Sequence, residues 1–167
     1  MWDKIKGYFN GYPERLNVAK ILIKYGLSVR NGKVYCGNIV IPVVRISRAA
    51  NVDRRTVIQT IKMIENNLEL KIIFGNISPA GSSLRDVAKY LNLGVIEITP
   101  VDARMPGILA AASSIIAQKS ISIRQAIVDD PELTPEPKLI LITETKVPGE
   151  LIPEFLKIKG VEKVSVY

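Results

Sequence analysis

The segment joining an apolar run at Leu93–Thr99 to an uncharged run at Ile108–Gln118 constrains the fold of this chain most. The first run is typical of a buried strand and the second of a packed helix. The chain therefore enters a helix through Pro106-Gly107, which leaves backbone N–H groups free beneath little side-chain bulk. Those groups and the positive end of the helix dipole favour a carboxylate or a phosphate.

Two charged residues of opposite sign, Asp102 and Arg104, lie within one turn of this point. A zwitterion such as an amino acid requires both charges, and Arg124 on a later strand is a second candidate partner for its carboxylate. An ordinary strand-to-helix turn with Pro at the first helical position would have the same spacing. The candidate ligand-binding residues are Asp102, Arg104, Met105, Pro106, Gly107, Ile108, Leu109 and Arg124.

The elements after Leu93 are predicted in the order strand, helix, strand, strand, helix, strand. This βαββαβ order is that of a ferredoxin-like fold, a four-stranded antiparallel sheet with two helices on one face. An acidic, proline-rich segment, residues 129–137, is expected to be an exposed loop. The predicted strands are Gly94–Thr99, Ser120–Val128, Lys138–Thr145 and Val161–Tyr167, and the helices are Pro106–Gln118 and Glu150–Ile158.

Charge is unevenly distributed along the chain. Residues 1–92 carry 15 Lys and Arg against 6 Asp and Glu, whereas residues 93–167 carry 8 against 10. A basic N-terminal half indicates contact with a polyanion, although a basic soluble domain would have the same composition.

A helix-turn-helix pattern lies inside this basic half. A short helix is predicted over Val43–Ala50, Asn51 occupies a tight turn that tolerates left-handed backbone, and Asp53 can cap the next helix. In that next helix Val57, Ile61 and Ile64 recur at helical spacing and are predicted to face inward.

Polar and basic side chains on the other face suit base edges and phosphates in a DNA major groove. Such patterns also arise by chance in helical proteins. The candidate DNA-binding residues are Arg45, Arg48, Arg54, Arg55, Thr56, Gln59 and Lys62.

The remaining N-terminal elements complete a small domain. We expect a short helix over Trp2–Phe9, a helix over Glu14–Tyr25 opened by Pro13, and a hairpin at Asn31-Gly32, where a type I′ turn needs positive φ angles. Leu70–Ile77 is predicted as a strand that could form a wing.

Turn-forming residues then mark a boundary, and Ser83 with Asp86 matches a capping box before a helix over Leu84–Leu91. The predicted organisation is a helix-turn-helix domain over residues 1–78, a linker and connector helix over 79–92, and a ligand-sensing domain over 93–167.

Several classes of function are disfavoured by composition. The chain has no histidine and one cysteine, Cys36, and it lacks a metal-ligand cluster and a phosphate-loop glycine motif, so we expect neither an enzyme nor a cofactor. No run of about twenty apolar residues exists, and the start lacks the plan of a signal peptide. A cytoplasmic location is therefore expected, with no membrane partner.

The phrase Asp102-x-x-x-Pro106-Gly107-x-Leu109 within the βαββαβ order resembles an ACT domain, the small-molecule-sensing module of amino-acid metabolism. Three residues separate Asp102 from Pro106, which departs from the closer spacing usual in that family. From Ile39 to Tyr167 the chain resembles archaeal predicted regulators of amino-acid metabolism, with an N-terminal helix-turn-helix and a C-terminal ACT domain. The resemblance implies a regulator without catalytic activity.

The expected function is thus a ligand-responsive transcriptional regulator that binds double-stranded DNA and an amino-acid effector as a homodimer or higher homo-oligomer. Two alternatives stay open. The protein could bind and regulate a metabolic enzyme in trans, or its second module could be the related sensor of feast/famine regulators, which shares the βαββαβ order.

Overall fold

The computed structural model describes residues 2–167 and divides them into two compact units, residues 2–81 and Ser82–Tyr167. Both are mixtures of helices and antiparallel sheet, which agrees with the expected α+β class. Within the described residues, no helix is long and apolar enough to cross a membrane.

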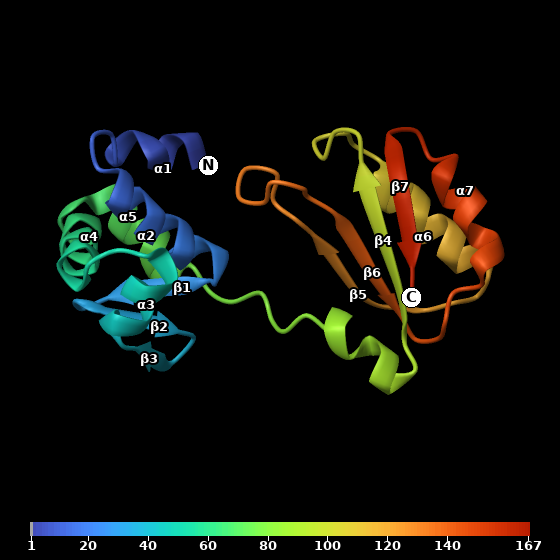
Figure 1. Ribbon diagram of the computed structural model, residues 1–167, viewed down its shortest axis with the longest axis horizontal. Helices are drawn as coiled ribbons and strands as arrows, with labels where there is room; N and C mark the ends of the chain where they lie inside the picture. The colour runs from blue at the N-terminus through green and yellow to red at the C-terminus, as the bar shows by residue number, and fades with distance from the viewer. Residues whose placement is uncertain (1) are drawn as a thin grey trace. The chain divides into compact units, whose positions relative to one another are not determined.

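Unit 1 combines five helices with a small antiparallel sheet (Figure 1). The predicted N-terminal helices and the hairpin at Asn31-Gly32 are confirmed, with both turn residues at positive φ. The strands pair in the order β1-β2-β3. The elements are α1 (Trp2–Tyr8), α2 (Pro13–Lys24), β1 (Leu27–Arg30), β2 (Lys33–Cys36), β3 (Ile39–Ile41), α3 (Val43–Ala50), α4 (Arg54–Asn66) and α5 (Leu68–Asn76).

The prediction of a strand at Leu70–Ile77 is wrong, because this segment forms α5. Asn67 caps the helix, its side-chain oxygen accepting a hydrogen bond from the backbone N–H of Leu70 at 3.0 Å. Leu70 and Phe74 are fully buried while Ile72 between them is 58% exposed, although all three would share one face of a strand. The small sheet of unit 1 instead precedes α3, so no wing follows α4.

Helices α2, α3 and α4 each contact the other two and form the centre of unit 1. Val18 and Leu22 of α2, Ile46 of α3 and Ile61 of α4 are almost completely buried. This packing fixes which side of α4 faces solvent.

Unit 2 has the βαββαβ order expected from the sequence, preceded by a 3-10 helix. Its strands pair in the order β5-β6-β4-β7, all antiparallel. Helices α6 and α7 cover one face of this sheet (Figure 1). The elements are η1 (Arg85–Leu91), β4 (Gly94–Pro100), α6 (Ile108–Gln118), β5 (Ile123–Val128), β6 (Leu139–Thr143), η2 (Gly149–Leu151), α7 (Ile152–Leu156) and β7 (Val161–Val166).

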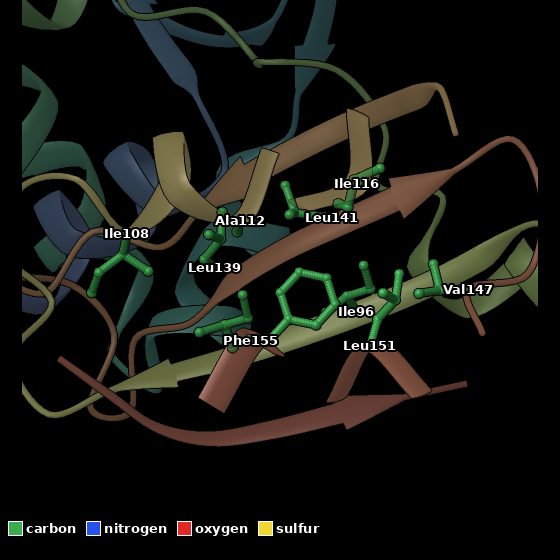
Figure 2. Packing of buried hydrophobic residues seen from close by; sticks show 10 residues of the cluster. Ile96, Ile108, Ala112, Ile116, Leu139, Leu141, Val147, Leu151 and Phe155 are labelled. Atoms are coloured by element: carbon green, nitrogen blue, oxygen red, sulfur yellow. The ribbon is translucent and has the colours of Figure 1, made fainter. Parts of the chain in front are cut away.

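The covered face of the sheet holds the larger core of this unit. Figure 2 shows the Phe155 ring of α7 among Ile96 of β4 and Leu139 of β6. Ile108 and Ala112 of α6 belong to the same cluster, so the start of α6 is anchored on the sheet. A second cluster on the opposite face includes Ala88 of η1.

Two connections differ from the prediction. The expected connector helix over Leu84–Leu91 is a 3-10 helix, and its cap residue Leu84 makes no side-chain capping bond. Ser83 Oγ instead accepts a hydrogen bond from the N–H of Arg85 at 3.3 Å, so the capping-box prediction is wrong. The expected helix over Glu150–Ile158 is shorter and split between η2 and α7.

Candidate functional sites

The turn between α3 and α4 is tight because Asn51 adopts the left-handed conformation, at φ 51° and ψ 50°. The N–H groups of Asn51 and Val52 donate to the carbonyl oxygens of Arg48 and Ser47, at 3.3 and 3.0 Å, and so satisfy the end of α3. Ser47 and Ala50 are buried, which lets the two helices approach closely.

Asp53 begins α4 as predicted. Its Oδ1 accepts a hydrogen bond from the backbone N–H of Arg55 at 2.7 Å. The predicted inward residues Val57, Ile61 and Ile64 are 0, 3 and 0% exposed, which confirms the orientation of the helix.

Opposite this buried side, α4 presents a polar stripe. Arg55, Gln59 and Lys62 recur at helical spacing and are exposed, as are Arg54 beside them and Asn66 at the end of the helix. Within residues 2–167, none of the cationic side chains Arg54, Arg55 and Lys62 forms an ion pair with a carboxylate. They therefore keep their charge available for a partner.

Two of the candidate DNA-binding residues, Thr56 and Gln59, already form hydrogen bonds with α2. Thr56 Oγ1 donates to Glu14 Oε2 at 3.0 Å, and Gln59 Oε1 accepts from Arg15 Nη2 at 2.9 Å. Arg15 and Glu14 are thus neighbours of the α4 stripe that sequence reasoning missed. The remaining candidates, Arg45 and Arg48, are exposed on α3.

In unit 2, the turn into α6 depends on Gly107, the N-cap residue, at φ +96°. Helix α6 has no side-chain cap, and its first bond to this turn runs from the N–H of Ala111 to the carbonyl of Gly107 at 2.9 Å. The N–H groups of the first helical residues therefore have no partner within the helix. A Cβ added at Gly107 would meet nothing within 4 Å, so the space above the turn is open.

A cavity of about 210 Å³ lies at this turn. Its lining is mostly apolar, and its only charged residues are Asp129 and Lys138. The lining residues are Pro100, Ala103, Met105, Gly107, Ile108, Leu109, Val128, Asp129, Pro137, Lys138 and Leu139.

The candidate ligand-binding residues are only partly brought together. Met105, Gly107, Ile108 and Leu109 line the cavity, whereas Pro106 is exposed beside them. Asp102 and Arg104 are also exposed and outside the lining, and Asp102 Oδ1 accepts from the backbone N–H of Arg104 at 2.9 Å. The Asp102 carboxylate therefore stabilises the turn and does not place a charge in the cavity.

Arg124 lies near the start of β5, and the strand reaches the cavity four residues later at Val128. At about 3.3 Å per residue these positions are about 13 Å apart. Arg124 pairs instead with Glu144, with 3.2 Å between Nη1 and Oε1. The structure therefore does not bring Arg124 to the cavity.

Among the lining residues that sequence reasoning missed, Pro100 and Ala103 lie close to the turn in the chain, whereas Val128, Asp129, Pro137, Lys138 and Leu139 come from β5, β6 and the loop between them. Asp129 and Lys138 are joined by two hydrogen bonds: the N–H of Asp129 donates to the carbonyl of Lys138 at 3.0 Å, and the N–H of Lys138 donates to Asp129 Oδ2 at 3.2 Å, which leaves Asp129 Oδ1 without a hydrogen-bond partner within residues 2–167. Only the antiparallel pairing of β5 with β6 brings them beside the β4–α6 turn.

The Lys138 side chain reaches a buried carboxylate, Glu97 of β4, which is 4% exposed. Lys138 Nζ lies 3.2 Å from Glu97 Oε2, and Arg85 of η1 donates to Oε1. Burial alone would raise the pKa of Glu97, but hydrogen bonds from Arg85 and Lys138 outweigh it and hold that pKa below its ordinary value.

Within residues 2–167, no group of three or more His, Cys, Asp or Glu residues is placed to hold a metal ion. Comparison with known proteins gives no family: no family model matches the chain, and no curated protein matches its sequence. The assignment of function accordingly depends on the two sites themselves.

Proposed function

We propose that this protein is a transcriptional regulator that binds double-stranded DNA through α4 and an amino acid at the β4–α6 turn. The observation that carries the proposal is the polar stripe of α4. Three cations that have no carboxylate partner among residues 2–167 lie on a helix that is capped by Asp53 and packed on the core through Val57, Ile61 and Ile64. A rigid helix with exposed cations fits the major groove.

The ligand half of the proposal is supported by the cavity at the start of α6. N–H groups without a partner inside the helix and the positive end of the helix dipole attract a carboxylate, while the apolar lining accepts a side chain. The strand order β5-β6-β4-β7 is that of a ferredoxin-like sheet, which supports an ACT-like sensor. We propose that Asp129, rather than Asp102 or Arg124, supplies a charged contact, since the Lys138 side chain is engaged by Glu97.

For the ligand to change the affinity for DNA, the protein would need two conformational states that differ in their affinity for the ligand. In a homodimer, two copies of α4 could reach adjacent major grooves about 34 Å apart. An effector that binds one dimer geometry better would shift the protein towards it by about 1–3 kcal/mol.

The DNA-binding half is tested by measuring affinity for genomic fragments over a salt series. We expect Arg54→Ala combined with Arg55→Ala to weaken binding and to flatten the salt dependence by about one unit of slope for each lost phosphate contact. The control, Lys157→Ala with Lys159→Ala, removes the same charge from exposed positions of unit 2 and should leave both unchanged.

Wild-type protein that binds no fragment, yet captures a metabolic enzyme in a pull-down, would contradict the proposal and favour regulation in trans. Equal losses in the two double variants would show that total charge, and not the α4 stripe, drives binding.

The ligand half is tested by thermal unfolding against the twenty amino acids, since a ligand that binds only the folded protein must raise its stability. Absence of a shift with every one of them would contradict the proposed effector class.

A further inference from the structure

We propose that Arg15, on α2 and outside the α3–α4 pair, positions Gln59 so that this glutamine reads DNA as a hydrogen-bond donor. The inference depends on the proposed DNA binding and extends it to sequence preference. It makes Arg15 a positioning residue, because it acts on bases through Gln59.

The Arg15 guanidinium is held by three contacts. It lies 4.2 Å from the centre of the Tyr12 ring, it donates to Gln59 Oε1 at 2.9 Å, and its Nη1 lies 3.9 Å from Met63 Sδ. A planar guanidinium stacked on a ring has few other orientations available. Gln59 is thus tied to a group that is itself fixed.

Arginine fixes which end of the Gln59 amide faces α2. A guanidinium has only donors, so the amide atom that it contacts must be the carbonyl oxygen. The amide nitrogen has no hydrogen-bond partner within residues 2–167 and keeps both of its protons to donate.

This arrangement changes what Gln59 can recognise. A free glutamine pairs with adenine through both amide atoms, accepting from N6 and donating to N7. Arg15 occupies one of the two lone pairs of Oε1 and holds that oxygen on the α2 side, whereas both amide protons are free within residues 2–167. Gln59 therefore favours an edge that offers acceptors alone, and guanine offers N7 and O6 in the major groove. We therefore expect a preference for guanine at the base pair that faces Gln59.

The neighbouring charges agree with this role. Glu14, the carboxylate next to Arg15 in the chain, accepts from Thr56 instead of pairing with Arg15. Within residues 2–167 Arg15 has no carboxylate partner, so its one strong hydrogen bond is the one to Gln59. The same bond places a cation beside the exposed stripe of α4.

The test is selection from a random duplex library with the full chain, followed by sequencing of the bound DNA. We expect Arg15→Ala to reduce the preference for guanine at one base pair on the order of tenfold. Gln59→Ala should lose the preference at the same base pair, and the double variant should lose no more than Gln59→Ala alone. Arg54→Ala should lower affinity for all sequences and leave the preference unchanged.

Outcomes separate the inference from the function on which it depends. If the wild type selects a site and Arg15→Ala weakens every sequence equally, Arg15 is only a phosphate contact and the inference is wrong. The same holds if the effects of Arg15→Ala and Gln59→Ala simply add. A wild type that enriches no sequence overturns the proposed function together with the inference.

Thermal unfolding of each variant identifies any that fail to fold, and Arg15→Lys, which keeps the charge but not the planar fork, then serves as the second variant.

Discussion

The two units offer binding sites of opposite construction. Residues 1–81 carry 13 Lys and Arg against 5 Asp and Glu, and the candidate site on α4 consists of exposed, charged side chains. Residues 82–167 carry 10 against 11, and their candidate site is an apolar cavity whose anion-attracting groups are backbone N–H groups. Unit 1 is therefore suited to a long polyanion and unit 2 to a small molecule.

The starts of α4 and α6 show the same contrast at the level of single residues. Asp53 satisfies an N–H of α4 with its own carboxylate, which removes that group from contact with a ligand. Gly107 leaves the start of α6 without a side-chain cap, which keeps its N–H groups accessible. A capped helix suits recognition by side chains, whereas an uncapped one suits recognition by backbone.

The largest expected effects test whether the two units are stabilised by separate cores. Phe155→Ala should cost about 3–5 kcal/mol in unit 2, because the side chain is fully buried among residues of β4, β6 and α6. Ile61→Ala should cost about 2–5 kcal/mol in unit 1. Hydrogen exchange should show lost protection only in the unit that carries the substitution. Loss of protection in both units by either variant would show that they unfold together.

Features encoded by a few neighbouring residues could be predicted from the sequence. Asn51 at the turn, Asp53 at the cap and Asn31-Gly32 in the hairpin each act on their own backbone, and the structure confirms all three. The strand predicted at Leu70–Ile77 failed because a short apolar run fits both helix and strand.

The cavity could be predicted only in part, because half of its wall comes from another segment. Gly107 and Leu109 are adjacent in the chain, but Val128 and Lys138 reach them through the pairing of β5 with β6. The charge of Arg124 predicts a ligand contact, but its position on β5 and its pairing with Glu144 place it away from the cavity. The charge of a residue can be read from the sequence. Whether that residue lies at the end of the strand next to the cavity can be known only from the structure of the sheet.

The next largest effect is expected from the buried carboxylate of unit 2, which has no equivalent on α4. Glu97→Gln should lower the free energy of unfolding by about 1.5–3 kcal/mol, since two hydrogen bonds from cations are weakened. The matched control is Glu144→Gln, whose carboxylate pairs with Arg124 at an exposed position and should matter little.

The same carboxylate predicts a pH dependence. Because the pKa of Glu97 is lowered in the folded protein, its contribution is present above the ordinary pKa of about 4.5 and is lost as the pH falls through the lower, folded value. The free energy of unfolding, measured with urea at pH 7 and at pH 3, should differ less between the two pH values for Glu97→Gln than for the wild type. An equal difference would mean that Glu97 does not titrate in this way.

A smaller effect tests the backbone character of the cavity. Gly107→Ala should cost about 1–2 kcal/mol, since φ is +96° and a Cβ disfavours that region. Gly37→Ala, also at positive φ with open space around it, controls for the strain. If an amino acid raises the melting temperature of the wild type, only Gly107→Ala should reduce that rise, because its methyl group enters the open space at the turn where the ligand is proposed to lie. An unchanged rise would place the ligand elsewhere.

The smallest effect is expected at the cap of α4, where hydrogen bond and charge can be separated. Asp53→Ala should lower the free energy of unfolding by about 1 kcal/mol, because the N–H of Arg55 loses its acceptor. Asp53→Asn keeps an acceptor oxygen at the same position but removes the negative charge, so its stability should stay close to that of the wild type. Urea unfolding of the three proteins measures both differences. If Asp53→Asn is as unstable as Asp53→Ala, the carboxylate acts through its charge on the helix dipole and on the arginines of α4. In that case Asp53→Asn should also raise affinity for DNA, since the charge that it removes lies beside Arg54 and Arg55 at the start of the stripe.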